Sequence, residues 1–227
     1  MAFIDVERKR HMKEERIENL TEDEEALIVG TLLGDAHIQK RGRSYRLKIE
    51  HGIDQSEYVE WKYKKLERLC NPGKKPKKNL NKKGFEQVHF YTRSGLWLER
   101  YHEMFYTEKE RNEGEFRPTK VRTRNLIDCL PMNPIVLATF FMDDGSVRND
   151  CTSGKLATQG FSKEENHLLN SYLGKWGIHC QVVAHKKSKN QYYLNLPAKS
   201  FRVLREVIEP IVNEIPQMSY KLNSRWI

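Results

Sequence analysis

The stretch Pro134–Gly145, PIVLATFFMDDG, joins an apolar segment to two adjacent carboxylates and a glycine. Its apolar residues recur at helical spacing, which predicts a helix with a wide buried face. Pro134 suits the first helical position, and Gly145 suits a left-handed residue at the helix end. Asp143 and Asp144 then fall in the last turn, beside free backbone carbonyls and at the partially negative end of the helix dipole. Acids in that position indicate that a cation binds there.

An earlier stretch, Ala26–Ala36 (ALIVGTLLGDA), has the same form with one carboxylate, Asp35. Aligned on the acids, Gly30–Ala36 lies over Thr139–Gly145. Asp35 and Asp144 are 109 residues apart, close to half of the 227-residue chain. A repeat of about half the length predicts two similar halves, each of which contributes one acid.

The composition indicates a basic globular protein. The chain has 40 Lys and Arg against 31 Asp and Glu, a net charge of +9, and 38% hydrophobic residues. The excess favours a polyanionic partner, nucleic acid or an anionic membrane, although a merely basic soluble protein stays possible. No apolar run approaches the ~20 residues of a membrane helix, and the charged N-terminus lacks a signal-peptide core. The four cysteines form no C-x-x-C pair, so we expect buried free thiols in a reducing compartment, either a bacterial or phage-infected cytoplasm or an organelle.

The same order of elements is expected twice: helix, two strands, helix, two strands, helix. In the first half, strands over 36–39 and 45–50 form a hairpin, 54–69 forms an amphipathic helix, 85–93 forms a strand and 95–105 a helix. In the second, hairpins over 146–161 and 178–196 flank a helix from Ser162 through Trp176, and a helix follows over 198–208. The charged segment Thr107–Thr119 is the best candidate connection. We therefore expect an arm over 1–20, halves over 21–112 and 125–227, and a linker over 113–124.

The two motifs resemble the paired LAGLIDADG motifs of homing endonucleases, in the divergent form with GxxLGDA first and FMDDG second. The resemblance runs from about residue 25 to the C-terminus, and IPQM-YKL at 215–222 is similar to the end of the single-chain yeast mitochondrial subgroup. It implies an α/β saddle of two pseudo-symmetric αββαββα halves whose antiparallel sheets form a DNA-binding groove. It also implies that a monomer cleaves both strands of a long asymmetric DNA site with Mg²⁺, which Mn²⁺ or Ca²⁺ can replace for binding.

The acids suit this chemistry because carboxylate oxygens can hold two divalent metals near a phosphodiester. We assign Asp35 and Asp144 as catalytic metal ligands. The carbonyls of Gly34 and Asp143, near the helix ends, are plausible additional metal ligands. Gly34 takes the place of Asp143 in the first half, so the Asp143 side chain has no counterpart and suits a local structural hydrogen bond. The small residue Gly30, with Gly34, would let the two helices approach closely.

Two further pairs belong to the candidate catalytic set. Glu50 follows Asp35 by 15 residues and Gln159 follows Asp144 by 15, both on the expected second strand of a hairpin. They could order water or support a metal, or simply face DNA or solvent. Lys120 and Lys221 align with basic residues that resemble the family's active-site lysines. Each could stabilise charge at the phosphate, or be an ordinary surface cation.

The exposed hairpin faces should bind DNA, because a β-ribbon fits the major groove and Arg, Lys, Gln and Asn reach base edges there. The expected DNA-binding residues are Gln39, Arg41, Arg43, Arg46, Lys48, Lys78, Asn81, His89, Arg93, Arg148, Asn149, Lys155, Lys186, Lys187 and Tyr192.

Two other functions stay open. A non-cleaving relative on the same scaffold could bind intron RNA as a maturase or regulate DNA, and a basic module could bind proteins. Two carboxylates facing a phosphate favour cleavage, because binding does not need them. A protein-binding module leaves the repeat unexplained. With no splice-like flanks visible, an intron-encoded or free-standing enzyme is favoured over an intein.

Overall fold

The computed structural model describes residues 19–112, 115–120, 124–148, 151–185 and 190–222. Nearly all of the expected N-terminal arm therefore lies outside the described residues. The first half contains α2 (Glu22–Leu33), β1 (His37–Arg41), β2 (Ser44–Gly52), α3 (Ser56–Leu66), β3 (Lys77–Leu80), β4 (Glu86–Tyr91) and α4 (Glu99–Phe105). The second half contains α6 (Pro134–Asp144), β7 (Gly145–Val147), β8 (Gly154–Leu156), α7 (Lys163–Gly174), β9 (Gln181–Ala184), β10 (Tyr192–Leu196) and α8 (Ala198–Val212).

The two halves share one topology. Each holds a four-stranded antiparallel sheet, ordered β1-β2-β4-β3 in the first half and β7-β8-β10-β9 in the second. Both halves run αββαββα, so the predicted α/β fold with two antiparallel sheets is confirmed. The strands of the second sheet are shorter, three residues each in β7 and β8.

Local sequence signals explain where the helices begin. The Thr21 side chain accepts from the backbone of Glu24 while the Glu24 side chain accepts from the backbone of Thr21, which closes the predicted capping box before α2. Ser162 caps α7 in the same way. Pro134 occupies the first turn of α6, preceded by an Asn133 cap.

The end of α6 differs from the prediction. Gly145 is extended, with φ −84° and ψ 152°, so the expected left-handed residue is wrong. The chain passes directly from the helix into β7 and needs no left-handed turn. Glycine is required there for space instead, since a Cβ at Gly145 would lie 2.4 Å from the carbonyl oxygen of Phe141.

The segment expected to join the halves has structure of its own. β5 (Tyr106–Asn112) pairs with β6 (Glu115–Lys120) as a separate two-stranded antiparallel sheet, and α5 (Arg124–Asp128) follows. β6 ends at Lys120, and so the hairpin returns the chain to the end of α2 before the second half begins.

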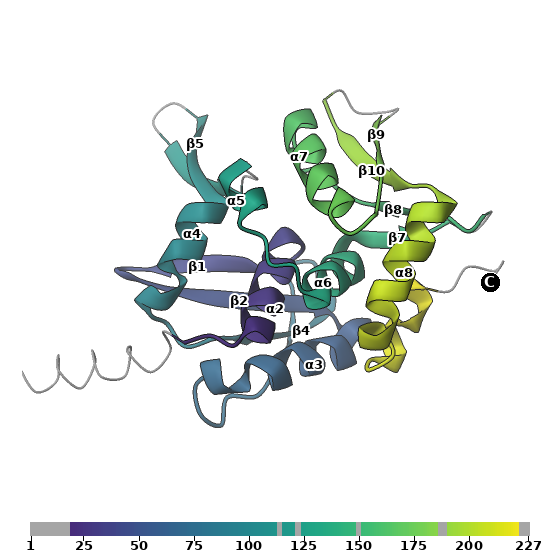
Figure 1. The fold of residues 1–227 in the computed structure, drawn as a ribbon. Helices are drawn as coiled ribbons and strands as arrows, with labels where there is room; N and C mark the ends of the chain where they lie inside the picture. Colours follow the sequence, from purple (N-terminus) through teal and green to yellow (C-terminus); the bar gives the residue numbers. More distant parts are fainter. Residues whose placement is uncertain (1–18, 113–114, 121–123, 149–150, 186–189, 223–227) are drawn as a thin grey trace, which may run out of the picture.

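Helices α2 and α6 lie side by side at the centre of the molecule, between the two sheets (Figure 1). Every residue from Ile135 to Met142 is buried, as are all from Ala26 to Leu33. One hydrophobic core therefore joins both halves. Within the described residues, no helix has the length and apolar character needed to cross a membrane.

Candidate functional site

The two motif helices touch through small residues. A Cβ built at Gly30 would lie 2.0 Å from Thr139 Oγ1 and 2.9 Å from the backbone of Val136. One built at Gly34 would lie 2.5 Å from the Cβ of Asp143. The predicted close approach at the two glycines is confirmed, and it brings the acidic end of each helix against the other.

The Asp143 side chain is fully buried and is bound by groups of the first half. Its Oδ1 accepts the Tyr58 hydroxyl at 2.8 Å and the Lys62 ammonium at 2.8 Å. Its Oδ2 accepts the backbone N–H of Asp35 at 3.2 Å and the Thr31 hydroxyl at 3.4 Å. Burial raises the pKa of Asp143, but Lys62 and the other partners outweigh burial, so the pKa is lowered and the carboxylate is ionised. The sequence predicts a local hydrogen bond for this side chain, but its hydrogen bonds instead connect the second half to the first.

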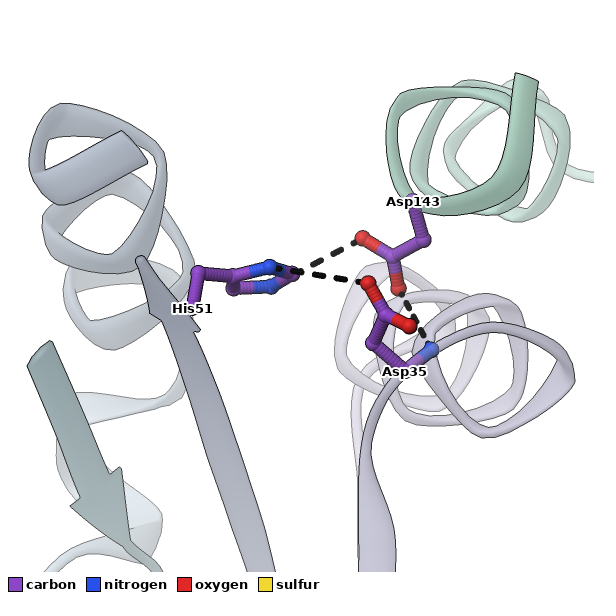
Figure 2. Close-up of side chains that lie close together, drawn as sticks. All are labelled: Asp35, His51 and Asp143. Carbon is purple, nitrogen blue, oxygen red and sulfur yellow. Dashed lines mark hydrogen bonds and ion pairs between the residues drawn. The ribbon is translucent and has the colours of Figure 1, made fainter. Parts of the chain in front are cut away.

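Asp35 presents a half-exposed carboxylate at the end of α2. Its side chain is 51% exposed, and its Oδ2 lies 3.7 Å from Nδ1 of the buried His51 (Figure 2). Burial and the nearby charge of Asp143 raise the pKa of Asp35, against the opposing influence of Lys62, Lys120 and Lys221. A carboxylate held against a second negative charge gains from a bound cation.

Asp144 is partly exposed and follows Asp143 directly at the end of α6. Its carbonyl accepts the backbone N–H of Ala157 at 2.8 Å, which ties the helix end to β8. Burial lowers the pKa of Lys221, while the charges of Asp143, Asp144 and Asp35 oppose that effect. The Lys221 ammonium therefore interacts electrostatically with the acids of both motifs.

Lys120 and Lys221 occupy equivalent places. The Lys120 ammonium donates to the carbonyls of Leu32 and Gly34, at 3.0 and 2.9 Å, and to that of Ala36. The Lys221 ammonium donates to the carbonyls of Asp143 and Gly145, at 3.4 and 2.8 Å.

These acceptors are related by the repeat, since Asp143 and Gly145 lie 109 residues after Gly34 and Ala36. Each lysine satisfies carbonyls that the helix end leaves free. The carbonyls of Gly34 and Asp143 keep their second lone pair for a metal, so their role as ligands stays a prediction.

A short 3₁₀ segment, Pro216–Lys221, carries Lys221 and is fastened to α3 of the first half. Glu57 and Gln217 exchange reciprocal backbone-to-side-chain hydrogen bonds at 2.9 and 3.3 Å. The Trp61 indole donates to Glu214 at 2.6 Å. The lysine of the second half is therefore positioned by the first.

The two residues of the other expected catalytic pair, Glu50 and Gln159, lie in different kinds of secondary structure. Glu50 lies on β2, where it pairs with Lys48 at 2.7 Å. Gln159 lies in a turn after β8, so its expected position on a strand is wrong. β8 is only three residues long and ends before it. The roles of both residues stay predictions.

The first sheet has an open face opposite the helix-covered one. Because directly paired antiparallel residues share a face, the register places these half-exposed side chains together: His37, Gln39, Arg46, Lys48, Glu50, His89 and Tyr91. Arg46 is held there, with its guanidinium 3.9 Å from the centre of the Tyr91 ring and its Nε donating to Gln39 at 3.0 Å. Four of the expected DNA-binding residues, Gln39, Arg46, Lys48 and His89, thus lie on this face.

The remaining candidates of the first half lie elsewhere. Arg41 and Arg43 are exposed at the β1–β2 turn. Lys78 pairs with the buried Val88, which puts it on the other face and leaves Lys77, opposite His89, on the open one. Asn81 shapes the β3–β4 turn by accepting two backbone N–H groups. Arg93 donates to the carbonyl of Arg68 at 2.6 Å.

The second sheet has a corresponding row, in which Lys155 pairs with Ser146 and Asn195, and Asn195 with Gln181. Arg148 is exposed just beyond β7. Tyr192 shares its face with the buried Leu194, whereas Tyr193 shares the open face with Asn195. Asn149, Lys186 and Lys187 lie outside the described residues.

This arrangement matches a known family. Residues 25–204 match the family model described as the LAGLIDADG DNA endonuclease family. The chain belongs to this family. The DNA endonuclease I-ChuI of Chlamydomonas applanata is 26% identical over 90% of this chain and 96% of its own length. The cytochrome b mRNA maturase bI2 of Saccharomyces cerevisiae is 28% identical over 88% of this chain, but that match spans 47% of the maturase.

The fold also matches a solved member. The homing endonuclease I-WcaI, bound to its DNA recognition sequence, has a TM-score of 0.73 and 23% identity, with 93% of this chain and 91% of that chain covered. This likeness shows the fold, and the single-chain, two-motif organisation agrees with the repeat in the sequence.

Sequence reasoning missed the buried polar residues beside the acids, although the pattern contained them. His51 continues the alternation of Leu47 and Ile49 on β2 and so belongs to the covered face. Lys62 is four residues after Tyr58, which puts it on the apolar side of α3. A lysine at a core position indicates a buried partner of opposite charge.

Proposed function

We propose that this chain is a site-specific endonuclease that uses divalent metal to hydrolyse phosphodiester bonds in both strands of a long, asymmetric DNA site. The observation that carries the proposal is the arrangement at the ends of α2 and α6. There Asp35 and Asp144 end paired helices, and Lys120 and Lys221 bind equivalent carbonyls. Binding alone would not require this duplicated set of acids and lysines.

The acids suit a divalent cation. Asp35, His51 and Asp143 each offer a ligand atom, and these atoms lie within 4.8 Å of one another. Since Lys62 and Tyr58 already bind the Asp143 carboxylate, we assign the metal to the carboxylates of Asp35 and Asp144. Mg²⁺ prefers such hard oxygen ligands, and Mn²⁺ or Ca²⁺ could take the same place. Bound Mg²⁺ would supply charge neutralisation and a water of lowered pKa.

The chain's own groups position the substrate and compensate its charge. The open sheet faces offer hydrogen-bonding side chains to the major groove, and Arg46, already held by Gln39 and Tyr91, is suited to a guanine edge. Lys120 and Lys221 each present an ammonium beside the acids, where charge develops on a phosphate during hydrolysis. I-WcaI, which is similar in fold, is bound to its DNA recognition sequence.

The test is cleavage of plasmid DNA that carries the intron-less form of the host gene, in Mg²⁺. We expect a discrete double-strand break from the wild type. Asp35→Asn and Asp144→Asn should lose cleavage but still bind the same DNA, because the basic sheet faces are unchanged. Asp128→Asn alters an exposed acid at the end of α5, outside both motif helices, and serves as the control. Cleavage that survives either motif substitution would remove this assignment.

A second candidate function is intron RNA binding. It rests on the similarity to maturase bI2, which covers most of this chain. Splicing of the host intron in the presence of the protein tests it. A maturase would promote splicing and leave the intron-less DNA intact.

A further inference from the structure

The ammonium of Lys62 is buried among the motif helices. The side chain has no exposure, so its charge needs protein acceptors. It has three: Asp143 Oδ1 at 2.8 Å, Thr31 Oγ1 at 2.9 Å and His51 Nε2 at 3.1 Å. An ammonium has three N–H donors, and each therefore has one acceptor.

This arrangement decides which nitrogen of His51 carries a proton. His51 Nε2 lies 3.1 Å from the Lys62 ammonium, which has only N–H donors and no lone pair, so Nε2 carries no proton and the ring is neutral. A neutral imidazole has one N–H and one acceptor nitrogen. Because Nε2 accepts from Lys62, the proton is on Nδ1, and Nδ1 is the nitrogen that faces Asp35 Oδ2 at 3.7 Å (Figure 2).

The hydrogen bonds of the neighbouring side chains agree with donation from Lys62 to His51 Nε2. Thr31 accepts from Lys62 and donates its own hydroxyl proton to Asp143. Tyr58 also donates to Asp143. The Gln55 side chain is a further hydrogen-bond partner of the His51 ring.

We propose that Lys62 is a positioning residue that fixes His51 as its Nδ1–H tautomer, and that this N–H orients the Asp35 carboxylate for cleavage. The separation of 3.7 Å exceeds a direct hydrogen bond by roughly 0.5 Å. Catalytic hydrogen bonds of this kind are often long before substrate binds and shorten in the complex, or a water bridges them.

The second half lacks an equivalent. Lys155 pairs with Ser146 as Lys48 pairs with His37, so Thr158 stands at the position of His51, and the starts of α3 and α7 put Leu169 at that of Lys62. Thr158 is buried and donates its hydroxyl to Asn166, and the buried Leu169 has no polar group. Loss of His51 should therefore impair the acid of one half and leave the other. If each acid serves mainly one strand, the expected product is nicked DNA.

The first experiment reads the tautomer without any cleavage. Full-length protein with ¹⁵N-labelled histidine, free of metal at pH 7.5, gives a two-bond ¹H–¹⁵N spectrum that distinguishes Nδ1–H from Nε2–H, and His51→Phe assigns the signal. We expect Nδ1–H in the wild type and a shift away from it in Lys62→Met. An Nε2–H or doubly protonated His51 in the wild type would overturn the proposal.

The second experiment measures cleavage, and here the inference rests on the proposed function. In single-turnover cleavage of supercoiled plasmid, His51→Phe should be about tenfold slower, as for partners that orient a metal ligand. Nicked circles should accumulate, and DNA affinity in Ca²⁺ should be unchanged. His51→Asn can place an amide N–H near the Nδ1 position and should cleave faster than His51→Phe.

Tyr172→Phe is the matched control, because it removes a buried hydroxyl that donates to the Pro131 carbonyl in the second half, away from this cluster. Equal cleavage by His51→Phe and the wild type would overturn the positioning role. If the wild type cuts no DNA, the proposed function fails, and the tautomer spectrum still decides the first part of the inference.

Discussion

The backbone N–H of Asp35 donates to the Asp143 carboxylate at 3.2 Å, so an acid of the second motif holds the acid of the first. The same carboxylate binds the buried ammonium of Lys62 at 2.8 Å. Asp143 therefore connects the two halves at the place where the proposed chemistry occurs. This role explains a second acid in one motif where the other has glycine, since Gly34 leaves the space that Asp143 fills.

Asp143→Asn should destabilise the fold. The amide keeps the shape but leaves Lys62 as a buried charge without its counter-ion, which costs about 3–5 kcal/mol. Denaturant unfolding at pH 7.5 measures the change in the free energy of unfolding. The exposed Asp128→Asn should stay within about 0.5 kcal/mol of the wild type. An unchanged stability in Asp143→Asn would show that this ion pair does not hold the halves together.

Gly30→Ala should also destabilise the protein, although alanine is the better helix former by about 1 kcal/mol. Its Cβ would lie 2.0 Å from Thr139 Oγ1 and 2.9 Å from the backbone of Val136, so α2 and α6 must move apart. Overpacking of this kind costs about 1–3 kcal/mol. Thermal unfolding compares it with Gly160→Ala, where the new methyl meets open space. Equal melting temperatures would contradict the close helix contact.

Much of this arrangement could be predicted from the sequence, because the repeat, the caps and the alternating strands are local signals. The acids at a helix end predicted a bound cation, and the structure supplies one from the chain itself, the ammonium of Lys62 at Asp143. The sequence did not reveal which of the acids binds the Lys62 ammonium. That depends on α3 packing across the end of α6, a contact between residues 81 positions apart.

The face of a short strand follows from its register with a neighbouring strand, which is not a local signal. The sequence therefore did not reveal that Tyr193 and Lys77 lie on the open sheet faces and their neighbours Tyr192 and Lys78 on the covered ones. Gln159 was placed on a strand because the repeat was extended past the end of β8. Lys120 and Lys221 follow from the resemblance alone. Which carbonyls they bind depends on how β6 and the C-terminal segment pack against the ends of α2 and α6.

Lys221→Met and Lys120→Met should each slow cleavage more than they weaken DNA binding. Both ammonium groups lie at the helix ends beside the acids. Loss of charge stabilisation at a reacting phosphate costs roughly 10²–10³ in rate. Single-turnover rates and affinities in Ca²⁺ separate the two effects, with the exposed Lys199→Met on α8 as control. Equal losses of rate and affinity would make these lysines ordinary phosphate contacts.

The cysteines should divide into two reactive and two inert thiols. The expectation of buried thiols is confirmed for Cys70 and Cys180 but is wrong for Cys129 and Cys151, which are exposed. Burial raises the pKa of Cys70 and Cys180 to about 12 each, so almost none of either thiol is the reactive thiolate at pH 8. A chromogenic disulfide reagent should titrate two thiols in the native protein and all four after denaturation. Rapid native reaction of all four would show that the core opens readily.

DNA binding should weaken steeply as salt rises, because lysine and arginine contacts to phosphate release counterions. Lys77 is exposed and pairs with His89 on the open face of the first sheet, so Lys77→Ala should lower the slope of log affinity against log salt by about one. Lys199→Ala, which removes an equal charge from helix α8, should leave that slope unchanged. Fluorescence anisotropy of labelled target DNA in Ca²⁺, between low and moderate salt, measures both. An equal change in the two variants would mean that net charge alone, and not the open sheet face, sets the affinity for DNA.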